Sequence, residues 1–506
     1  MASATTIDDP PGVRPGRAGC RRRFAVAVLT VLAALIRLPT LAQQSFWLDE
    51  AYTERLVRMS FGGMLHGVAQ TESTPPVYYA LAWGWTHIVG QDEFGLRSLS
   101  ALAGIATVPV VYLAAERLAG RRAGVVAGLL VASSPLLVWF SQEARAYALA
   151  GLLAAATLLC LVAYLQDDRA GWLAGWAVCA ALGLGTHYFV GFVVAAEVVL
   201  MVWRRRERWS GGLVVALAVV VVIAIALVPL ALAQRGTGHA DYIAQGSLST
   251  RIAQVPKQLL IGYASPGQLA TGLLAGLLVL GGAVPPLLRR RATLGRARLP
   301  LTIGIAAVIV PIGLALIGID FLNTRNLLVA LPALAVAAAV GFAAAMPRGL
   351  GVACAGGLAL LGVVVVILVD THDRYQRDDW RGVSHALGTS PGARAIVVSP
   401  GSGLIALQAY RSGLRTLTTP AAVTELDVVA VPQQVTGGGI GTPPRPVTPP
   451  ALPAGFTLSK LVAAQAYTVL RYRAAAPVAI TPMVAAADHL GPGSFTVLLQ
   501  NSPGSG

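Results

Sequence analysis

The chain has 506 residues, of which 55% are hydrophobic and only 12% are charged. Long apolar runs of about the thickness of a bilayer core indicate a polytopic helical membrane protein and exclude a purely soluble one. The net charge of +15 is carried almost entirely by Arg, in short clusters between the apolar runs. This distribution argues against nucleic-acid binding and is typical of signals that orient a membrane protein.

About eleven apolar segments of spanning length follow one another, with ends uncertain by several residues. They are residues 24–42, 97–116, 123–140, 145–165, 171–187, 188–203, 211–233, 268–288, 299–320, 327–346 and 349–369. The first is long, lacks a convincing cleavage site and is followed directly by an Asp-Glu pair, so we interpret it as a retained span. The sequence thus predicts a basic tail, residues 1–23, and a transmembrane domain, residues 24–369.

Arginine clusters precede the first span and occupy every second loop after it. They are Arg14, Arg17 and Arg21 to Arg23, then Arg117, Arg121 and Arg122, then Arg204 to Arg206 and Arg208, then Arg289 to Arg291, Arg296 and Arg298, then Arg348. The loop at 167–169, with two acids and one Arg, is the weak member. The positive-inside rule therefore places the N-terminus in the cytoplasm, and an odd number of spans places the C-terminal region outside.

Two of the expected outside loops are long, residues 43–96 and 234–267. Within the first, FGGMLHGVA and PVYYALAWGWTHIVG carry apolar and aromatic residues at helical spacing, which predicts helices lying along the membrane surface. A short re-entrant segment is the alternative for residues 77–90.

Beyond residue 370 the composition changes, and ARAIVVSP, LDVVAVPQ and AYTVLRYR have strand character. We expect a small extracytoplasmic α/β domain at 370–475, interrupted by a Pro/Gly-rich loop at 437–454, and a poorly specified tail at 476–506. The four cysteines all fall in the cytoplasmic tail or the spans, so no disulfide is expected in this domain, and their spacing fits no metal motif.

The Asp49-Glu50 pair, in FWLDEAYT, lies just beyond the first span on the outside. Carboxylates this close to hydrocarbon are costly, so a functional site is the first hypothesis, and a solvated turn is the alternative. A carboxylate in this place can act as a general base on a hydroxyl.

If the second substrate is a lipid-linked phospho-sugar, its anionic leaving group requires cations at the membrane surface. Candidates at the outer ends of spans are Arg97, Arg145, Lys257 and Arg325. Each one alone is equally well explained as an ordinary interfacial cation. Two acidic features have plainer explanations. Glu197, within a span, could be a relay residue, but packing against a neighbouring helix, either paired with a cation or protonated, is the plainer explanation. Asp378-Asp379 are expected to cap a helix.

Seven patterns occur in a fixed order: FWLDEAYT, TESTPPVYYALAWGW, EFGLRSLSALAGIATVPVVYLAAERLAG, WFSQEARAYALAGLLAA, THYF, NTRNLLVALPALA and DDWRGVSHAL. Together they resemble the bacterial family of polyprenol-phosphate-sugar-dependent membrane glycosyltransferases of the C-fold type. This family is related to the protein O-mannosyltransferases and the lipid A aminoarabinose transferases. The resemblance covers about residues 24–390.

The resemblance implies roles for residues in these patterns. Asp49 would orient and deprotonate the acceptor with support from Glu50, and Glu143 and Arg145 would reach the same cavity. Other residues implied as cavity or entrance residues are Pro75, Pro76, Tyr79, His187 and Tyr188. A neutral interfacial histidine is the alternative for His187. Many relatives have a His before the Pro-Pro pair, where Thr74 stands here, so we expect no essential metal and no cofactor.

The resemblance further implies a mannosyltransferase-like enzyme that moves mannose or a similar hexose or pentose from polyprenyl phosphate to an acceptor hydroxyl, by one inverting displacement. The acceptor would be a protein, glycolipid or cell-wall glycan, and the setting the bacterial plasma membrane. A lipid flippase or transporter is the main alternative, although no clear inverted repeat is visible. A polymerase or ligase of lipid-linked glycans is the other.

Overall fold

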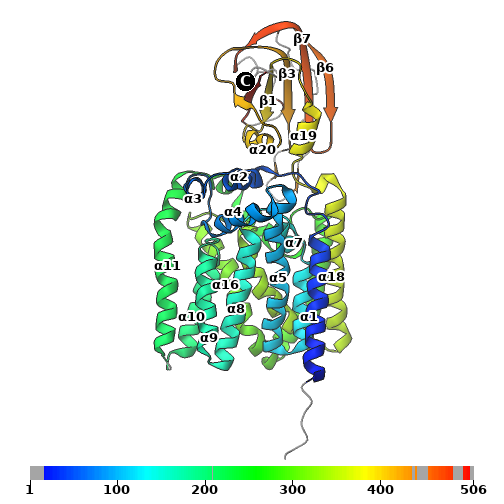
Figure 1. The fold of residues 1–506 in the computed structure, drawn as a ribbon. Helices are drawn as coiled ribbons and strands as arrows, with labels where there is room; N and C mark the ends of the chain where they lie inside the picture. The colour runs from blue at the N-terminus through cyan, green and yellow to red at the C-terminus, as the bar shows by residue number, and fades with distance from the viewer. Residues whose placement is uncertain are drawn as a thin grey trace, which may run out of the picture.

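The computed structural model describes residues 16–207, 209–432, 434–435, 439–440, 454–482, 490 and 494–501. A helical bundle carries a layer of short helices on one end, and a small sheet domain lies beyond that layer (Figure 1). The N-terminal helix α1 starts at the opposite end of the bundle. The predicted loop at 437–454 falls almost entirely outside the described residues, as do Arg14 and Arg208.

The bundle consists of helices that coincide with the predicted apolar segments. They are α1 (Gly16–Arg37), α5 (Glu93–Ala119), α6 (Arg121–Ser133), α7 (Pro135–Ser141), α8 (Tyr147–Asp167), α9 (Ala170–Leu184), α10 (Val190–Arg205), α11 (Gly211–Gly236), α14 (Gln268–Gly282), α15 (Val284–Arg289), α16 (Arg291–Leu316), η1 (Asn326–Ala330), α17 (Leu331–Ala344) and α18 (Arg348–Thr371).

Seven of the described segments are long and apolar enough to cross a membrane, or eight if α6 and α7, bent by 57° at Ser134, form one broken span. This supports a multi-pass membrane protein but does not confirm the predicted count of eleven. The difference has physical causes, since α9 and α10 have only 15 and 16 residues and the first third of α1 is rich in Arg. Pro135 at the start of α7 explains the bend.

The basic loops meet at the end of the bundle away from the sheet domain. Arg22 pairs with Glu116 at 2.9 Å, near the beginning of α1. The loop that weakened the charge pattern supplies both of its acids to neighbouring arginines, with Asp167 on Arg117 at 3.1 Å and Asp168 on Arg205 at 2.8 Å. Its low net charge is therefore explained by pairing with the adjacent basic loops.

The other end of the bundle is covered by the two long loops. The first holds α2 (Leu48–Val57), α3 (Phe61–Thr71) and α4 (Val77–Val89), which form the layer beneath the sheet domain (Figure 1). The second holds α12 (Tyr242–Gln245) and α13 (Leu248–Ile261). Helices α3 and α4 thus coincide with FGGMLHGVA and PVYYALAWGWTHIVG, the two segments of the first loop that were predicted to be helical. Tyr78, Tyr79 and Ala82 of α4 are fully buried against this layer and the bundle.

The sheet domain contains η2 (Asp373–Tyr375), α19 (Trp380–Leu387), β1 (Arg394–Ser399), α20 (Gly403–Tyr410), β2 (Leu414–Thr416), β3 (Ala421–Ala430), β6 (Phe456–Ala463), β7 (Thr468–Ile480) and β8 (Thr496–Gln500), with a separate hairpin of β4 (Gln434–Val435) and β5 (Gly439–Ile440). The strand order is β2-β8-β1-β3-β7-β6, and β1 and β3 are parallel. The sheet does not end at residue 475 as expected, because β7 continues to Ile480 and β8 pairs with both β1 and β2.

The domain is docked onto the helical layer through apolar and polar contacts. Trp380 is 1% exposed and shares a buried cluster with Ala51 of α2 and with β1. The Tyr410 hydroxyl donates to Glu93 at 2.6 Å, and Arg381 pairs with the same carboxylate at 2.5 Å. These contacts fix α19 and α20 of the sheet domain against the first outside loop.

Candidate active site

The Asp-Glu pair begins helix α2 directly after Trp47. Glu50 lies in the first turn and accepts from the Trp47 backbone N–H at 3.4 Å, so it contributes to the helix cap. Its neighbour points elsewhere, because adjacent side chains on a helix diverge by about 100°. Asp49 retains 23% of its side-chain exposure, whereas Glu50 has none. The two carboxylates therefore have different environments.

Glu50 is enclosed by hydrogen-bond donors. Arg97 binds it with two N–H groups, at 2.7 Å to Oε1 and 2.5 Å to Oε2, and the Ala144 backbone N–H donates at 2.8 Å. The remaining Arg97 bonds go to three backbone carbonyls, at 2.8 to 2.9 Å. This buried bidentate pair has no donor left for a substrate, which argues against the phosphate contact predicted for Arg97 and against a basic role for Glu50.

Asp49 instead faces Arg325, which donates from Nη1 to Oδ2 at 2.9 Å. Arg325 lies just before η1 and also binds the Tyr242 hydroxyl of α12. Its guanidinium carbon lies 5.7 Å from the centre of the Tyr147 ring. The contacts of Arg325 therefore join three segments that are far apart in the sequence, namely the first outside loop, the second outside loop and the NTRN segment.

Arg145, in the turn between α7 and α8, also contacts Asp49. It donates to the Asp49 carbonyl at 3.2 Å and makes a bidentate pair with Glu72, at 2.8 and 2.6 Å. Glu72 also accepts from the Tyr79 hydroxyl at 2.7 Å. Glu72 was not predicted as a site residue from the sequence. It lies in TESTPP, two residues before Thr74, the position at which many relatives have a His.

Glu143, in the same turn as Arg145, is fully buried and forms an ion pair with Arg377 at 2.9 Å. Burial raises the pKa of Glu143 to about 7, although the charge of Arg377 opposes the rise. Its Oε1 has no hydrogen-bond partner among the described residues. Burial likewise raises the pKa of Asp378 to about 7, and the negative charge of Asp49 contributes.

His187 is 3% exposed and packs against Tyr147, with the ring centres 5.4 Å apart. Its Nδ1 accepts from the Phe189 backbone N–H at 3.2 Å, and its Nε2 is buried without a partner among the described residues. Burial lowers the pKa of His187 to about 3, and the charges of Arg325 and Arg145 act in the same direction. The ring is therefore neutral, and it lies on the wall of the site.

Two other predicted site residues, Tyr188 and Lys257, bind residues other than Asp49 and Arg325. Tyr188 donates to Gln234 at 2.8 Å, and Gln234 in turn binds the backbone of Val68 and Thr74. Lys257, on α13, binds Gln268 at the start of α14. Tyr188 therefore links helices. The structure gives no described contact that brings Lys257 into the Asp49–Arg325 group.

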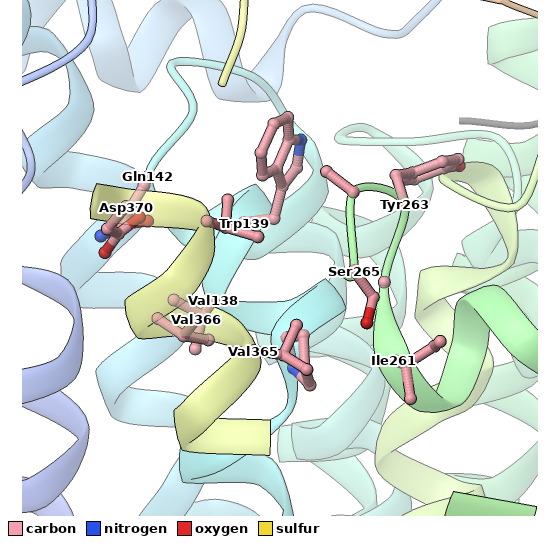
Figure 2. Close-up of a pocket in the computed structure, with 13 residues that line it drawn as sticks. Val138, Trp139, Gln142, Ile261, Tyr263, Ser265, Val365, Val366 and Asp370 are labelled. Carbon is pink, nitrogen blue, oxygen red and sulfur yellow. The ribbon is translucent and has the colours of Figure 1, made fainter. Parts of the chain in front are cut away.

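A small, open pocket lies between α7, α18 and the loop after α13 (Figure 2). Figure 2 shows Val138, Val365 and Val366 on one side and Ile261 on the other, with Gln142 and Asp370 at one end. Gln142 directly precedes Glu143 in the chain. The pocket is thus lined mainly by apolar residues, and Gln142 at one end of it is the chain neighbour of Glu143.

Comparisons with known proteins agree with this architecture. Residues 73–232 match the family model described as dolichyl-phosphate-mannose-protein mannosyltransferase. ArnT from Cupriavidus metallidurans bound to undecaprenyl phosphate is 17% identical, with a TM-score of 0.51 over 78% of this chain and 85% of that chain. Its apo state is 16% identical, with a TM-score of 0.51 over 77% and 85%.

The apo oligosaccharyltransferase of Archaeoglobus fulgidus is 13% identical, with a TM-score of 0.48 over 77% of this chain and 63% of that chain. No curated protein matches the chain significantly. Residues 73–232 thus resemble the mannosyltransferase family model, and the chain shares the fold of ArnT, which agrees with the resemblance predicted from the sequence.

Proposed function

We propose that the protein transfers a sugar from a polyprenyl-phosphate donor to an acceptor hydroxyl on the extracytoplasmic side of the membrane that it spans. The observation that carries this proposal is the pairing of Asp49 with Arg325. A carboxylate and a guanidinium that are both partly exposed, 2.9 Å apart, provide a base and an anion-binding group in one place. A general base and a cation that stabilises the leaving group each favour transfer from a lipid phosphate to a hydroxyl.

Asp49 accepts the proton of the acceptor hydroxyl as that oxygen attacks the anomeric carbon. The bond from the sugar to the phosphate oxygen breaks, and the electron pair stays on the phosphate. Arg325 stabilises the departing phosphate because its charge is close by and its Nε lacks a partner among the described residues. A single displacement of this kind inverts the anomeric configuration.

The remaining charged groups have supporting roles in the proposal. Arg145 holds the carbonyl of Asp49 and is itself neutralised by Glu72, so it orients the base. Arg97 and Glu50 fix the first turn of α2. Tyr79 donates a hydrogen bond to Glu72, and His187 packs against Tyr147. Glu143 lies in the turn that carries Arg145.

The sugar is a monosaccharide such as mannose or a pentose, and the acceptor a glycan, glycolipid or protein. We further propose that the Arg-rich end of the bundle faces the cytoplasm of a bacterial plasma membrane, so that the site and the sheet domain are outside. Under this orientation the donor lipid reaches the site from the outer leaflet.

The test supplies radiolabelled polyprenyl-phosphate mannose, and separately the arabinose form, to membranes that contain the protein or lack it. Label that appears in water-soluble or protein-bound product only with the protein supports the proposal. Label that stays on the lipid but moves between leaflets would favour the flippase. Growth of a multi-sugar chain on the lipid would favour the polymerase.

A further inference from the structure

The linker between α18 and the sheet domain enters the site region through Arg377. This side chain is 5% exposed, and its Nη2 donates to Glu143 at 2.9 Å and to the Trp139 carbonyl at 3.2 Å. Its guanidinium carbon lies 4.0 Å from the centre of the Trp139 ring. A charged residue from the linker is therefore buried in the bundle next to the site.

The partner of Arg377 belongs to the turn that contacts both acidic residues of α2, Glu50 through its carboxylate and Asp49 through its backbone carbonyl. In this turn, the Ala144 backbone N–H binds Glu50 at 2.8 Å, and Arg145 binds the Asp49 carbonyl at 3.2 Å. Glu143 itself makes no described contact with α2. Its effect on Asp49 thus passes through the position of the turn and through its charge.

Glu143 faces charged or titratable groups from several elements. They are Asp49 and Glu50 of α2, Tyr78 of α4, Arg325 before η1 and Arg377 of the linker. Among the described residues, Arg377 alone forms an ion pair with it. Removing one partner of a buried pair leaves the other as an uncompensated charge, which must take up a proton or move.

We propose that Arg377 is a positioning residue for the reaction: it neutralises Glu143, holds the 142–145 turn against α2, and so makes assembly of the site depend on docking of the sheet domain. The inference rests on the proposed function. Docking sets the position of Arg377 because the residues that follow it, at the start of the sheet domain, bind Ser45 of the first outside loop. The Asp378 carbonyl accepts from Ser45 at 2.9 Å, and Ser45 accepts from the Trp380 N–H at 3.0 Å.

The first arm of the test measures transfer by the full-length protein with Arg377→Gln, Glu143→Gln and both together. Arg374→Gln is the matched control, because this exposed arginine lies in the same linker. We expect kcat to fall between about tenfold and about 100-fold in Arg377→Gln, with the donor KM nearly unchanged, and part of the loss to return in the double variant. Equal activity of Arg377→Gln and wild type, or full additivity of the two losses, would overturn the proposal.

The pH profile separates this role from simple loss of structure. Ionised Glu143 is the form that holds Arg377, so the acid limb of kcat has a midpoint near the Glu143 pKa of about 7. Without Arg377 the buried carboxyl binds its proton more tightly, and the limb moves to higher pH. The double variant lacks this limb. A limb that is identical in all four proteins contradicts the proposal.

The second arm does not depend on activity. Hydrogen–deuterium exchange, read by mass spectrometry, follows the backbone amides of residues 142–146 in detergent. Faster exchange there in Arg377→Gln than in Arg374→Gln supports the positioning of the turn, and equal exchange overturns it. If wild type transfers no sugar, the proposed function fails, and this arm still decides the role of Arg377.

Discussion

Arg325 donates a hydrogen bond to Asp49 across 276 positions of the chain. The pair joins the first outside loop to the turn that begins η1, and α12 contributes the Tyr242 hydroxyl to the same guanidinium. In the proposed reaction, an entering phosphate would compete with Asp49 for this cation. Release of Asp49 at the moment of donor binding would leave the carboxylate free to accept the hydroxyl proton.

Arg325→Gln should weaken donor binding as well as transfer. The neutral amide cannot compensate the phosphate charge, and a charge-assisted hydrogen bond contributes about 1.5–3 kcal/mol, which corresponds to roughly 10- to 150-fold in affinity. Binding of undecaprenyl phosphate, measured by quenching of Trp fluorescence, checks this. Arg235→Gln is the control, since Arg235 is exposed at the end of α11. Unchanged binding in Arg325→Gln would remove Arg325 from the phosphate site.

Arg97→Ala and Glu50→Gln should act on stability first. Each change leaves a fully buried partner unpaired, at a cost of about 3–5 kcal/mol. Melting in detergent and folded yield are the measurements, and both variants should fall well below wild type. A variant Arg97→Ala that melts like wild type but fails to bind undecaprenyl phosphate would restore the phosphate role predicted from the sequence.

His187 should make the protein less stable in acid. Its pKa is about 3 in the folded protein and about 6.5 in the unfolded chain, so the unfolded chain binds the extra proton as pH falls below 6.5. Stability from this group is therefore complete above pH 6.5 and decreases by about 2 kcal/mol at pH 5.

Melting temperatures at pH 7.5 and pH 5 test this dependence. His187→Gln should lose less stability than wild type on acidification. His239→Gln, which changes an exposed ring, should behave like wild type. An equal acid loss in wild type and His187→Gln would show that the ring takes up a proton in the folded state.

Transfer should survive removal of divalent cations. Among the described residues no three His, Cys, Asp or Glu side chains are arranged to hold a metal ion, and Asp49 already faces a guanidinium. Activity with EDTA should stay within about twofold of the untreated membranes, because Arg can stabilise the leaving phosphate. A large loss that Mn²⁺ or Mg²⁺ restores would contradict this expectation.

The apolar segments were predictable from the sequence because about 20 uncharged residues in a row leave few alternatives to a helix in a bilayer. The number of spans was harder, since the Arg-rich start of α1 and the short α9 do not satisfy a criterion of length and hydropathy. Strand β8 was missed because a five-residue strand after a Gly-Pro-Gly segment carries little signal by itself.

The candidate site was predictable as a set of residue types but not as a set of pairs. Local patterns selected Asp49, Arg145 and Arg325, which the structure brings together. They did not reveal that Glu72 pairs with Arg145, 73 positions away, or that Arg377 reaches Glu143 across 234. Such pairings depend on how helices pack, which one sequence read by itself does not specify.

The proposed role of Asp49 is tested by sugar transfer in purified membranes with radiolabelled polyprenyl-phosphate mannose. Wild type, Asp49→Asn and Asp373→Asn are compared at equal protein level, the last because Asp373 is an exposed acid of the linker. Loss of a general base lowers the rate by about 10²–10⁴. We predict a decrease of this size in Asp49→Asn and full activity in Asp373→Asn, whereas normal transfer by Asp49→Asn would contradict the account.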